Sequence, residues 1–417
     1  MSRNLRVFIG AAIIFYLIAA MNEATALYVL AGIALAAIAG CYWLSRLAVA
    51  GLALTIQLPR AEVQANSEVP VRLTLDNIGV ISRPGPLVTL DVTNLSIPGV
   101  GERYELGLPP LPAGASVTAT TDIHLPSRGR WQVGPARIIG TDPLGMFHRE
   151  GPASPTVPLL VLPEMFEVPW MWRHDLLSPA ARLAARARTR HGGEFWGIRQ
   201  HEPGDDLRHV HWKVTAHRGD MVVKEYARGR ELAAAVWLDL NSANLVGEGS
   251  TSSLELSITM AASIIPALLH MDQAVSLVGS GLPVSLGSAG RGEATAQRAL
   301  RALAEVQATN GRPFAALVAE QAREARPGLT AIVICSGVEP GLDHTLLTAA
   351  ARGVSLRCLL LAPASSLTPE QRARQEALSN ALRHAGIPVA TAGDRKDLPH
   401  TLGRLSESTV GGKAAAL

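Results

Sequence analysis

The chain is poor in cysteine. Its 417 residues contain only Cys41, Cys335 and Cys358, which have neither the spacing of a metal motif nor the number needed for a disulfide framework. Free thiols without such a framework are typical of a reducing compartment. The sequence therefore argues against a disulfide-stabilised secreted domain, while its length predicts two or three domains.

Charged and aromatic residues are also scarce, at 18% and 4% of the chain. The formal net charge is only +3, and no basic stripe with interleaved aromatic residues occurs, so we expect no nucleic-acid partner. The phosphate-binding sequence G-x-x-x-x-G-K-[ST] does not occur either, so the chain is not expected to hydrolyse a nucleotide itself. Hydrophobic residues, in contrast, make up 48% of the chain.

Two long apolar runs open the sequence, at 5–21 and 24–44. Each is near the roughly 20 residues that cross the hydrocarbon core of a bilayer as a helix. The link between them is Asn22-Glu23, which leaves room only for a tight turn. The sequence therefore predicts a transmembrane helical hairpin over residues 1–48.

The charges beside these runs predict their orientation. Arg3 and Arg6 precede or open the first run and Arg46 follows the second, whereas Glu23 is the charge at the turn. The positive-inside rule then places both ends in the cytoplasm, as in a two-pass protein of the inner membrane. A cleaved signal peptide ending at the small residues "ATA" is the alternative, although the second run would still anchor the chain.

Three patterns follow the hairpin. Residues 49–165 alternate apolar and polar positions between frequent Pro and Gly, which predicts a β-sandwich-like domain. Residues 233–405 alternate buried-strand runs with helical patterns, which predicts a doubly wound α/β domain with a mostly parallel sheet. Residues 166–232 are expected to form a linker and a charged signature segment, and residues 406–417 a disordered tail.

The first strand of the predicted α/β domain ends in "LDLNSAN". This position resembles the Asp-x-Ser-x-Ser metal site of von Willebrand factor A domains, where a carboxylate and hydroxyls bind Mg²⁺. Asp239 and Asn241 occupy the first two positions, but Ala243 cannot ligate a metal. Ser336 stands where a closing Asp is expected, and Thr309 is the candidate threonine. The site is degenerate, and we expect no metal and no cofactor.

The segment 191–226 is rich in His, Asp, Glu and Arg. Asp205 is a candidate helix N-cap and Gly219 a candidate stop. On a helix, His209 and His211 would lie about 200° apart, too far round to share a metal. Apart from Tyr226, Thr215 is the one hydroxyl of the segment, so no Ser or Cys nucleophile is available, although a His/Asp acid–base pair stays open.

The segment can also be interpreted as a structural element. Arg and Asp side chains of the segment can tie a loop to a helix through charge-assisted hydrogen bonds. Trp196 and Trp212 can clamp that loop onto the flanking domains. A charged loop on a rigid sheet is also a suitable docking surface.

These residues resemble the signature of the family called domain of unknown function 58. The matching positions, which we take as the signature and candidate docking residues, are Gly197, Arg199, Pro203, Gly204, Asp205, Asp206, Arg208, Trp212, Lys224 and Glu225. The order of hairpin, β-rich domain with a "DPLGMF" turn, signature and α/β domain also resembles that family. His211, Thr215 and His217 depart from its usual residues.

The resemblance implies partners as well as a fold. Such proteins are typically associated with a MoxR-type AAA+ ATPase, often beside a transglutaminase-like membrane protein. The implied role is a membrane-anchored cytoplasmic scaffold or adaptor for client proteins in assembly or stress response, rather than an enzyme. The alternatives are an enzyme that uses His and Asp groups of 191–226 and a metal-dependent adhesion module.

Overall fold

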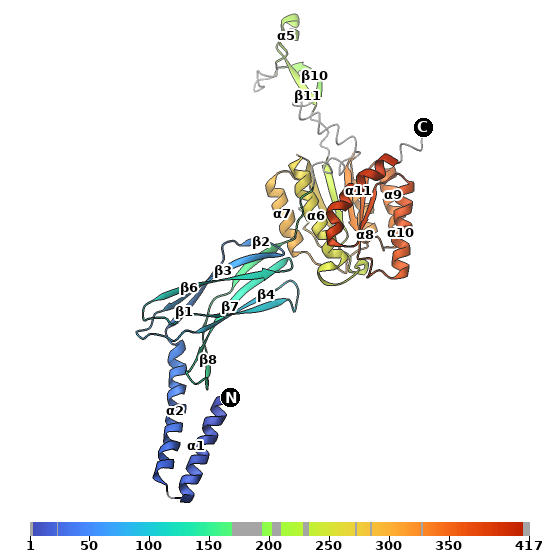
Figure 1. Cartoon of the computed structure of the whole chain (residues 1–417). Helices are drawn as coiled ribbons and strands as arrows, with labels where there is room; N and C mark the ends of the chain where they lie inside the picture. The colour runs from blue at the N-terminus through green and yellow to red at the C-terminus, as the bar shows by residue number, and fades with distance from the viewer. Residues whose placement is uncertain are drawn as a thin grey trace. The chain divides into compact units, whose positions relative to one another are not determined.

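The computed structural model of the protein describes a large part of the chain, drawn in Figure 1. The described residues are 3–22, 24–168, 194–201, 210–227, 233–271, 273–283, 286–326 and 328–411. The chain divides into two compact units, Met1–Leu162 and Pro163–Leu417.

The first unit opens with two helices that pack against each other, α1 (Arg3–Asn22) and α2 (Thr25–Val49). Both are long and apolar enough to cross a membrane, with mean hydropathies of 1.9 and 2.0. Only 11% and 17% of the respective apolar windows are buried in the protein, so most of their apolar surface is available to lipid. The predicted pair of apolar helices is confirmed.

Nine of the sixteen strands that the structure describes form the rest of the first unit. They are β1 (Leu52–Gln57), β2 (Glu62–Gln64), β3 (Ser67–Asn77), β4 (Leu87–Asn94), β5 (Gly101–Gly107), β6 (Ser116–Leu125), β7 (Gly129–Thr141), β8 (His148–Ala153) and β9 (Val157–Leu162). One sheet has the order β1-β3-β6 and the other β2-β9-β7-β4-β5, with β8 paired to β7. All of these pairings are antiparallel except that of β2 with β9.

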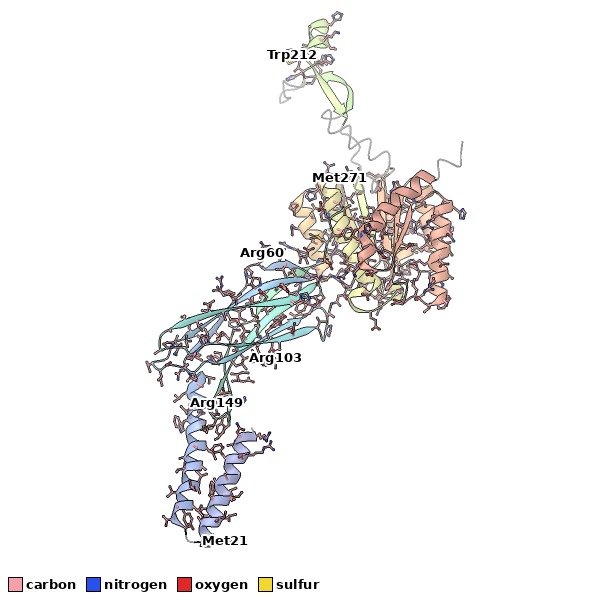
Figure 2. All side chains as sticks on the ribbon, in the orientation of Figure 1. Met21, Arg60, Arg103, Arg149, Trp212 and Met271 are labelled. Atoms are coloured by element: carbon pink, nitrogen blue, oxygen red, sulfur yellow. The ribbon has the colours of Figure 1, made fainter. Side chains whose placement is uncertain are left out.

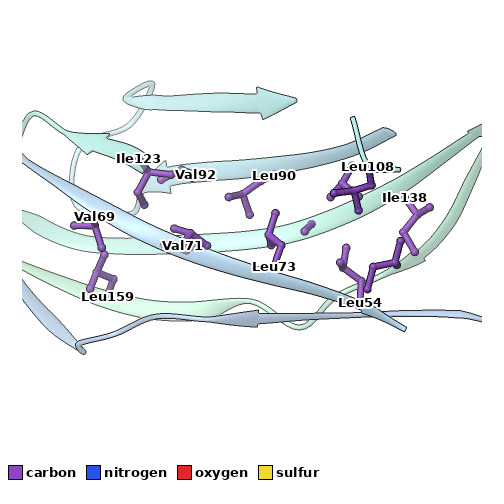
Figure 3. Packing of buried hydrophobic residues seen from close by; sticks show 14 of the residues in the cluster. Leu54, Val69, Val71, Leu73, Leu90, Val92, Leu108, Ile123, Ile138 and Leu159 are labelled. Carbon is purple, nitrogen blue, oxygen red and sulfur yellow. The ribbon is translucent and has the colours of Figure 1, made fainter. Parts of the chain in front are cut away.

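Alternation along the strands builds the core of this domain. In β3, Val69, Val71, Leu73 and Leu75 are buried while the residues between them are more exposed, because successive side chains point to opposite faces of a strand. They pack against residues of the second sheet such as Leu90, and the two sets interdigitate in Figure 3. The β-rich pattern therefore folds as two sheets around one apolar layer, as a sandwich does.

The second unit contains a β-hairpin and an α/β domain. The hairpin consists of β10 (Glu194–Gln200), α5 (Trp212–Arg218) and β11 (Val222–Ala227). The α/β domain contains β12 (Ala233–Leu238), α6 (Ser253–His270), β13 (Ala274–Gly279), α7 (Glu293–Glu305), α8 (Phe314–Glu324), β14 (Thr330–Cys335), α9 (Leu342–Ala351), β15 (Ser355–Leu361), α10 (Pro369–His384), β16 (Val389–Ala392) and α11 (Leu398–Gly411).

The sheet of the α/β domain has the order β13-β12-β14-β15-β16, and each of these pairs is parallel. Successive residues of each strand point to opposite faces of the sheet. Trp237 and Val333 join the core made with α8, α9 and α10, whereas α6 contacts β12 to β15 and α7. The predicted parallel sheet between helices is confirmed. Helix α6 is also long and apolar, but 72% of its window is buried, which identifies it as a core helix.

Local signals set several helix ends. Thr368 and Gln371 form the capping box that starts α10, and Gly386 follows its end with φ 70°, as the sequence predicts. The predicted disordered tail differs from the structure, because α11 continues to Gly411. Leu405 of α11 is buried, and the helix continues for one to two turns beyond it. Residues 412–417 lie outside the described part.

Candidate functional site at the carboxyl edge of the parallel sheet

The candidate site lies where the strand order changes direction. From β12 the chain moves to β13 on one side, while β14 pairs with β12 on the other. The loops that follow β12 and β14 therefore diverge at the carboxyl edge, which is the usual ligand position in open parallel sheets. The backbone N–H of Asp239 donates to the carbonyl of Ile334 at 2.9 Å, which holds Asp239 at this point.

Asp239 is buried, with 8% of its surface exposed. Its Oδ1 accepts the backbone N–H of Asn241 at 3.0 Å, and its Oδ2 accepts the Asn244 side-chain amide at 3.0 Å. Burial raises the pKa of Asp239 to about 7, against these hydrogen bonds, which lower it; the charge of Glu339 raises it further. The predicted loop-ordering carboxylate is therefore held at a pKa where it titrates near neutrality.

Glu339 is a second carboxylate of the site, and sequence reasoning missed it. The same Asn244 amide nitrogen donates to Glu339 Oε2 at 2.8 Å. Glu339 also accepts the N–H of Phe314 at 3.0 Å and of Ala315 at 3.1 Å, the first donors of α8. Because these N–H groups have no partner inside the helix, Glu339 caps α8 from another loop. The one sequence feature that could have identified Glu339 is its position as an acidic residue three places after Ser336.

Thr309 approaches the site from a third loop. It forms a parallel bridge with Asn241, and its backbone exchanges hydrogen bonds with Leu240 and Ser242 at 2.8 and 3.0 Å. The side chain of Ser242 also bonds to that of Asn310. Within the described residues, the buried hydroxyl oxygens of Thr309 and Ser336 have no hydrogen-bond partner. The loops after β12, α7 and β14 thus converge, as the positions of Asp239, Thr309 and Ser336 led us to expect.

The residues present do not fit a von Willebrand-type Mg²⁺ site. Both oxygens of Asp239 already accept hydrogen bonds, and the Asn241 Oδ1 accepts the N–H of Ala243 at 3.1 Å. Across the described residues there is no group of three or more His, Cys, Asp or Glu side chains arranged to hold a metal. Hard divalent cations need several oxygen ligands; Ala243 supplies none, and the oxygens of Asp239 and Asn241 already hold the loop through hydrogen bonds.

The signature residues that the structure describes lie on the hairpin β10–β11. Gly197 pairs with Glu225, Ile198 with Lys224 and Arg199 with Val223, so the two ends of the signature lie side by side. The register shifts between Phe195 and Gly197, a β-bulge that re-aims the strand. The other signature positions, Pro203, Gly204, Asp205, Asp206 and Arg208, lie outside the described residues, as does His209.

The expected signature helix differs at residues 210 and 211, which are extended, while its expected start at Asp205 lies outside the described residues. Helix α5 begins at Trp212, because Val210 is buried in a bridge with Val223 and the N–H of His211 donates to the Val222 carbonyl. These contacts with β11 hold the backbone in an extended form where a helix was expected. The stop is as predicted, since Gly219 ends α5 with a left-handed φ of 79°. Trp212, labelled in Figure 2, is 63% exposed.

No curated protein matches the chain. Among solved structures, the CARDB domain of the PF1109 protein from Pyrococcus furiosus, described in complex with di-metal ions, is 14% identical, covering 26% of this chain and 91% of that one, with a TM-score of 0.19. The C-terminal domain of wzt is 11% identical, covering 27% and 73%, with a TM-score of 0.21. TM-scores this low do not support any conclusion about the fold or function of this chain.

The family comparison is more informative, because it covers the hairpin and the carboxyl-edge site together. Residues 197–387 match the model of the family described as "Protein of unknown function DUF58". The match begins at Gly197, the first residue of the signature, and runs through β12, β14 and their loops. Residues 197–387, somewhat less than half of the chain, are therefore similar to the family described as "Protein of unknown function DUF58".

Proposed function

We propose that the chain is a membrane-anchored cytoplasmic adaptor that binds a protein partner at the carboxyl edge of its α/β domain. The observation that carries this proposal is that both carboxylates at the carboxyl edge hold loops in place. Asp239 orders its own loop, and Glu339 joins that loop to the start of α8. Carboxylates that are already hydrogen-bonded to their own loops suit a rigid binding surface better than a catalytic reaction.

The rim of the site is suited to contact with another protein. The loop residues Ala243, Asn310 and Pro340 are exposed around the buried centre. They stand on loops fixed by the hydrogen bonds described above, and a preorganised surface loses less entropy on binding. The exposed Trp212 on the signature hairpin is a second candidate contact, since exposed aromatic side chains are frequent anchors at interfaces.

The resemblance to the family supports a MoxR-type AAA+ ATPase as the partner, with client proteins and a transglutaminase-like membrane protein as further members of the assembly. The two apolar helices support a bilayer anchor. The excess of Arg at their outer ends supports a cytoplasmic position for both units. In this role the chain presents clients or positions the ATPase and does not itself act as an enzyme.

A pull-down from native membranes with quantitative mass spectrometry tests the proposal. Ala243→Arg places a bulky charge on the exposed rim and is expected to lose the partner. Ala385→Arg is the matched control, since Ala385 is exposed and ends α10 at the opposite, amino edge of the sheet. Asp205→Ala and Arg208→Ala test the signature. Equal recovery of the same partners by all variants would refute the proposed docking surface.

Calorimetry with Mg²⁺ separates this proposal from metal-dependent adhesion. The committed oxygens of Asp239 and Asn241 lead us to expect no tight binding. Tight binding of Mg²⁺ that Asp239→Ala abolishes would replace the adaptor proposal with the adhesion module.

A further inference from the structure

The loop between β7 and β8 returns to the outer end of the helical hairpin. Asp142 holds this loop in shape, because its carboxylate accepts the N–H of Leu144 at 3.0 Å and of Phe147 at 2.6 Å. The Asn4 side chain of α1 donates to the Leu144 carbonyl at 2.8 Å. The Phe147 ring meets the Tyr42 ring of α2 edge-on, with centroids 5.7 Å apart. The sandwich therefore touches both helices.

This contact lies level with the end of the apolar spans. The helices meet at their tip through Asn22 and Thr25, so the first turn of α1 lies level with about residues 41–44 of α2 when both rise 1.5 Å per residue. The second apolar run of the sequence ends at Leu44. Trp43 is 65% exposed there, as an aromatic side chain at a membrane–water interface is expected to be.

Two arginines share one aromatic ring at this level. The guanidinium carbons of Arg46 on α2 and Arg149 on β8 each lie 5.6 Å from the centroid of the Tyr42 ring. Among the described residues, neither arginine forms a salt bridge with a carboxylate. Figure 2 shows Arg149 beside the helical hairpin and Met21 at its far tip. Two like charges near one ring repel each other, and an anion bound between them would offset that repulsion.

Two acidic residues of this region, Asp142 and Glu150, form no salt bridge with these arginines among the described residues. The Asp142 carboxylate accepts N–H groups of its own loop and the Cys41 thiol of α2. Glu150 follows Arg149 in β8, so its side chain points to the opposite face of the strand. Arg3 and Arg6, on the first turns of α1, add positive charge at the same depth. These four arginines, Arg3, Arg6, Arg46 and Arg149, are called the arginine collar below.

We infer that Arg46 and Arg149, stacked over Tyr42, bind the phosphate of an anionic phospholipid at the membrane surface, within the arginine collar. Guanidinium groups suit this ligand because they donate to phosphate oxygens in a fixed fork. The inference rests on the membrane anchoring proposed above and adds a lipid class and a site to it. It also gives the β-sandwich, through Arg149, a direct contact with the bilayer.

The test uses the full chain in nanodiscs that contain phosphatidylcholine and phosphatidylglycerol. Native mass spectrometry counts the two lipids retained by each chain. We expect enrichment of phosphatidylglycerol by the wild type and loss of that preference in Arg46→Gln/Arg149→Gln. At about 1 kcal/mol per arginine near an anionic surface, the preference should fall about fivefold for each arginine, or roughly 25-fold for both.

Arg60→Gln/Arg72→Gln removes the same charge from exposed positions of the sandwich, and Figure 2 shows Arg60 at the end away from the helices. This control should keep the preference. Equal loss in both double variants, or no loss in either, would overturn the inference. Competition by inorganic phosphate in place of the lipid would also overturn it, since the site would then take the free ion.

Resistance to alkaline carbonate separates this inference from the anchoring. An inserted chain without preference for phosphatidylglycerol would refute the lipid site alone. A chain that carbonate releases would refute the membrane anchoring, and the lipid site with it.

Discussion

Asp239→Asn gives the most direct test of the carboxyl-edge site, because it removes the charge and keeps the size of the side chain. The Asn Oδ1 can still accept the N–H of Asn241, which Asp239 accepts at 3.0 Å. The new amide would face the Asn244 amide as a second donor, so one hydrogen bond is lost. That loss costs about 1 kcal/mol of unfolding free energy and does not depend on pH.

The pH dependence carries the prediction. The pKa of Asp239 in the folded chain is about 7, above its ordinary value of 3.8. Between these values the folded chain holds a proton that the unfolded chain has lost, so the stabilisation is full below the ordinary pKa and is lost as pH rises through 7. From pH 5 to pH 8, the unfolding free energy of the wild type should fall by about 2.5 kcal/mol relative to the variant.

Amide hydrogen exchange of β12 and β14, followed by mass spectrometry in the full chain, measures the opening free energy of this domain. Asp343→Asn is the matched control, because it removes an exposed carboxylate from α9 of the same domain. The wild type and Asp239→Asn should diverge as the pH rises. Parallel curves from pH 5 to pH 8 would refute the argument that burial holds a proton on Asp239.

Three further predictions concern packing and capping. Glu339→Ala should lower the stability of the α/β domain by about 1–2 kcal/mol and speed hydrogen exchange in the first turn of α8; unchanged exchange there would contradict its capping role. Gly140→Ala would place a Cβ 2.6 Å from the Val49 side chain and should destabilise the first unit by about 1–3 kcal/mol, whereas Gly107→Ala, with open space around it, should not. Thr368→Ala should cost about 1 kcal/mol in thermal unfolding, and Thr368→Ser should restore it.

The sequence predicts those parts of the fold that local patterns control. Alternation over Val69 to Leu75 identifies a strand of the sandwich because only one of its faces is buried. The capping box at Thr368 identifies the start of α10 because its two hydrogen bonds lie within one turn. The apolar runs at the N-terminus identify two helices by length and composition alone.

Contacts between distant segments could not be read in the same way. Val210 and His211 were expected in a helix but are extended, because Val210 pairs with Val223 on the next strand and α5 begins at Trp212. Glu339 is a site residue only because the loop after β14 meets the start of α8. No periodicity within either loop encodes that meeting, and the same holds for the contact of Phe147 with Tyr42.

The close packing of α2 on the sandwich has a mechanical consequence. Gly140 and Gly151 leave no room between β7, β8 and Val49 at the end of the helix, and α2 runs for 25 residues without interruption. Because α2 and the sandwich pack this closely, they are expected to move together as one rigid body. In the membrane-anchored chain proposed above, helices tilt when the bilayer becomes thinner than their apolar length, so a thinner bilayer would tilt the sandwich together with α2.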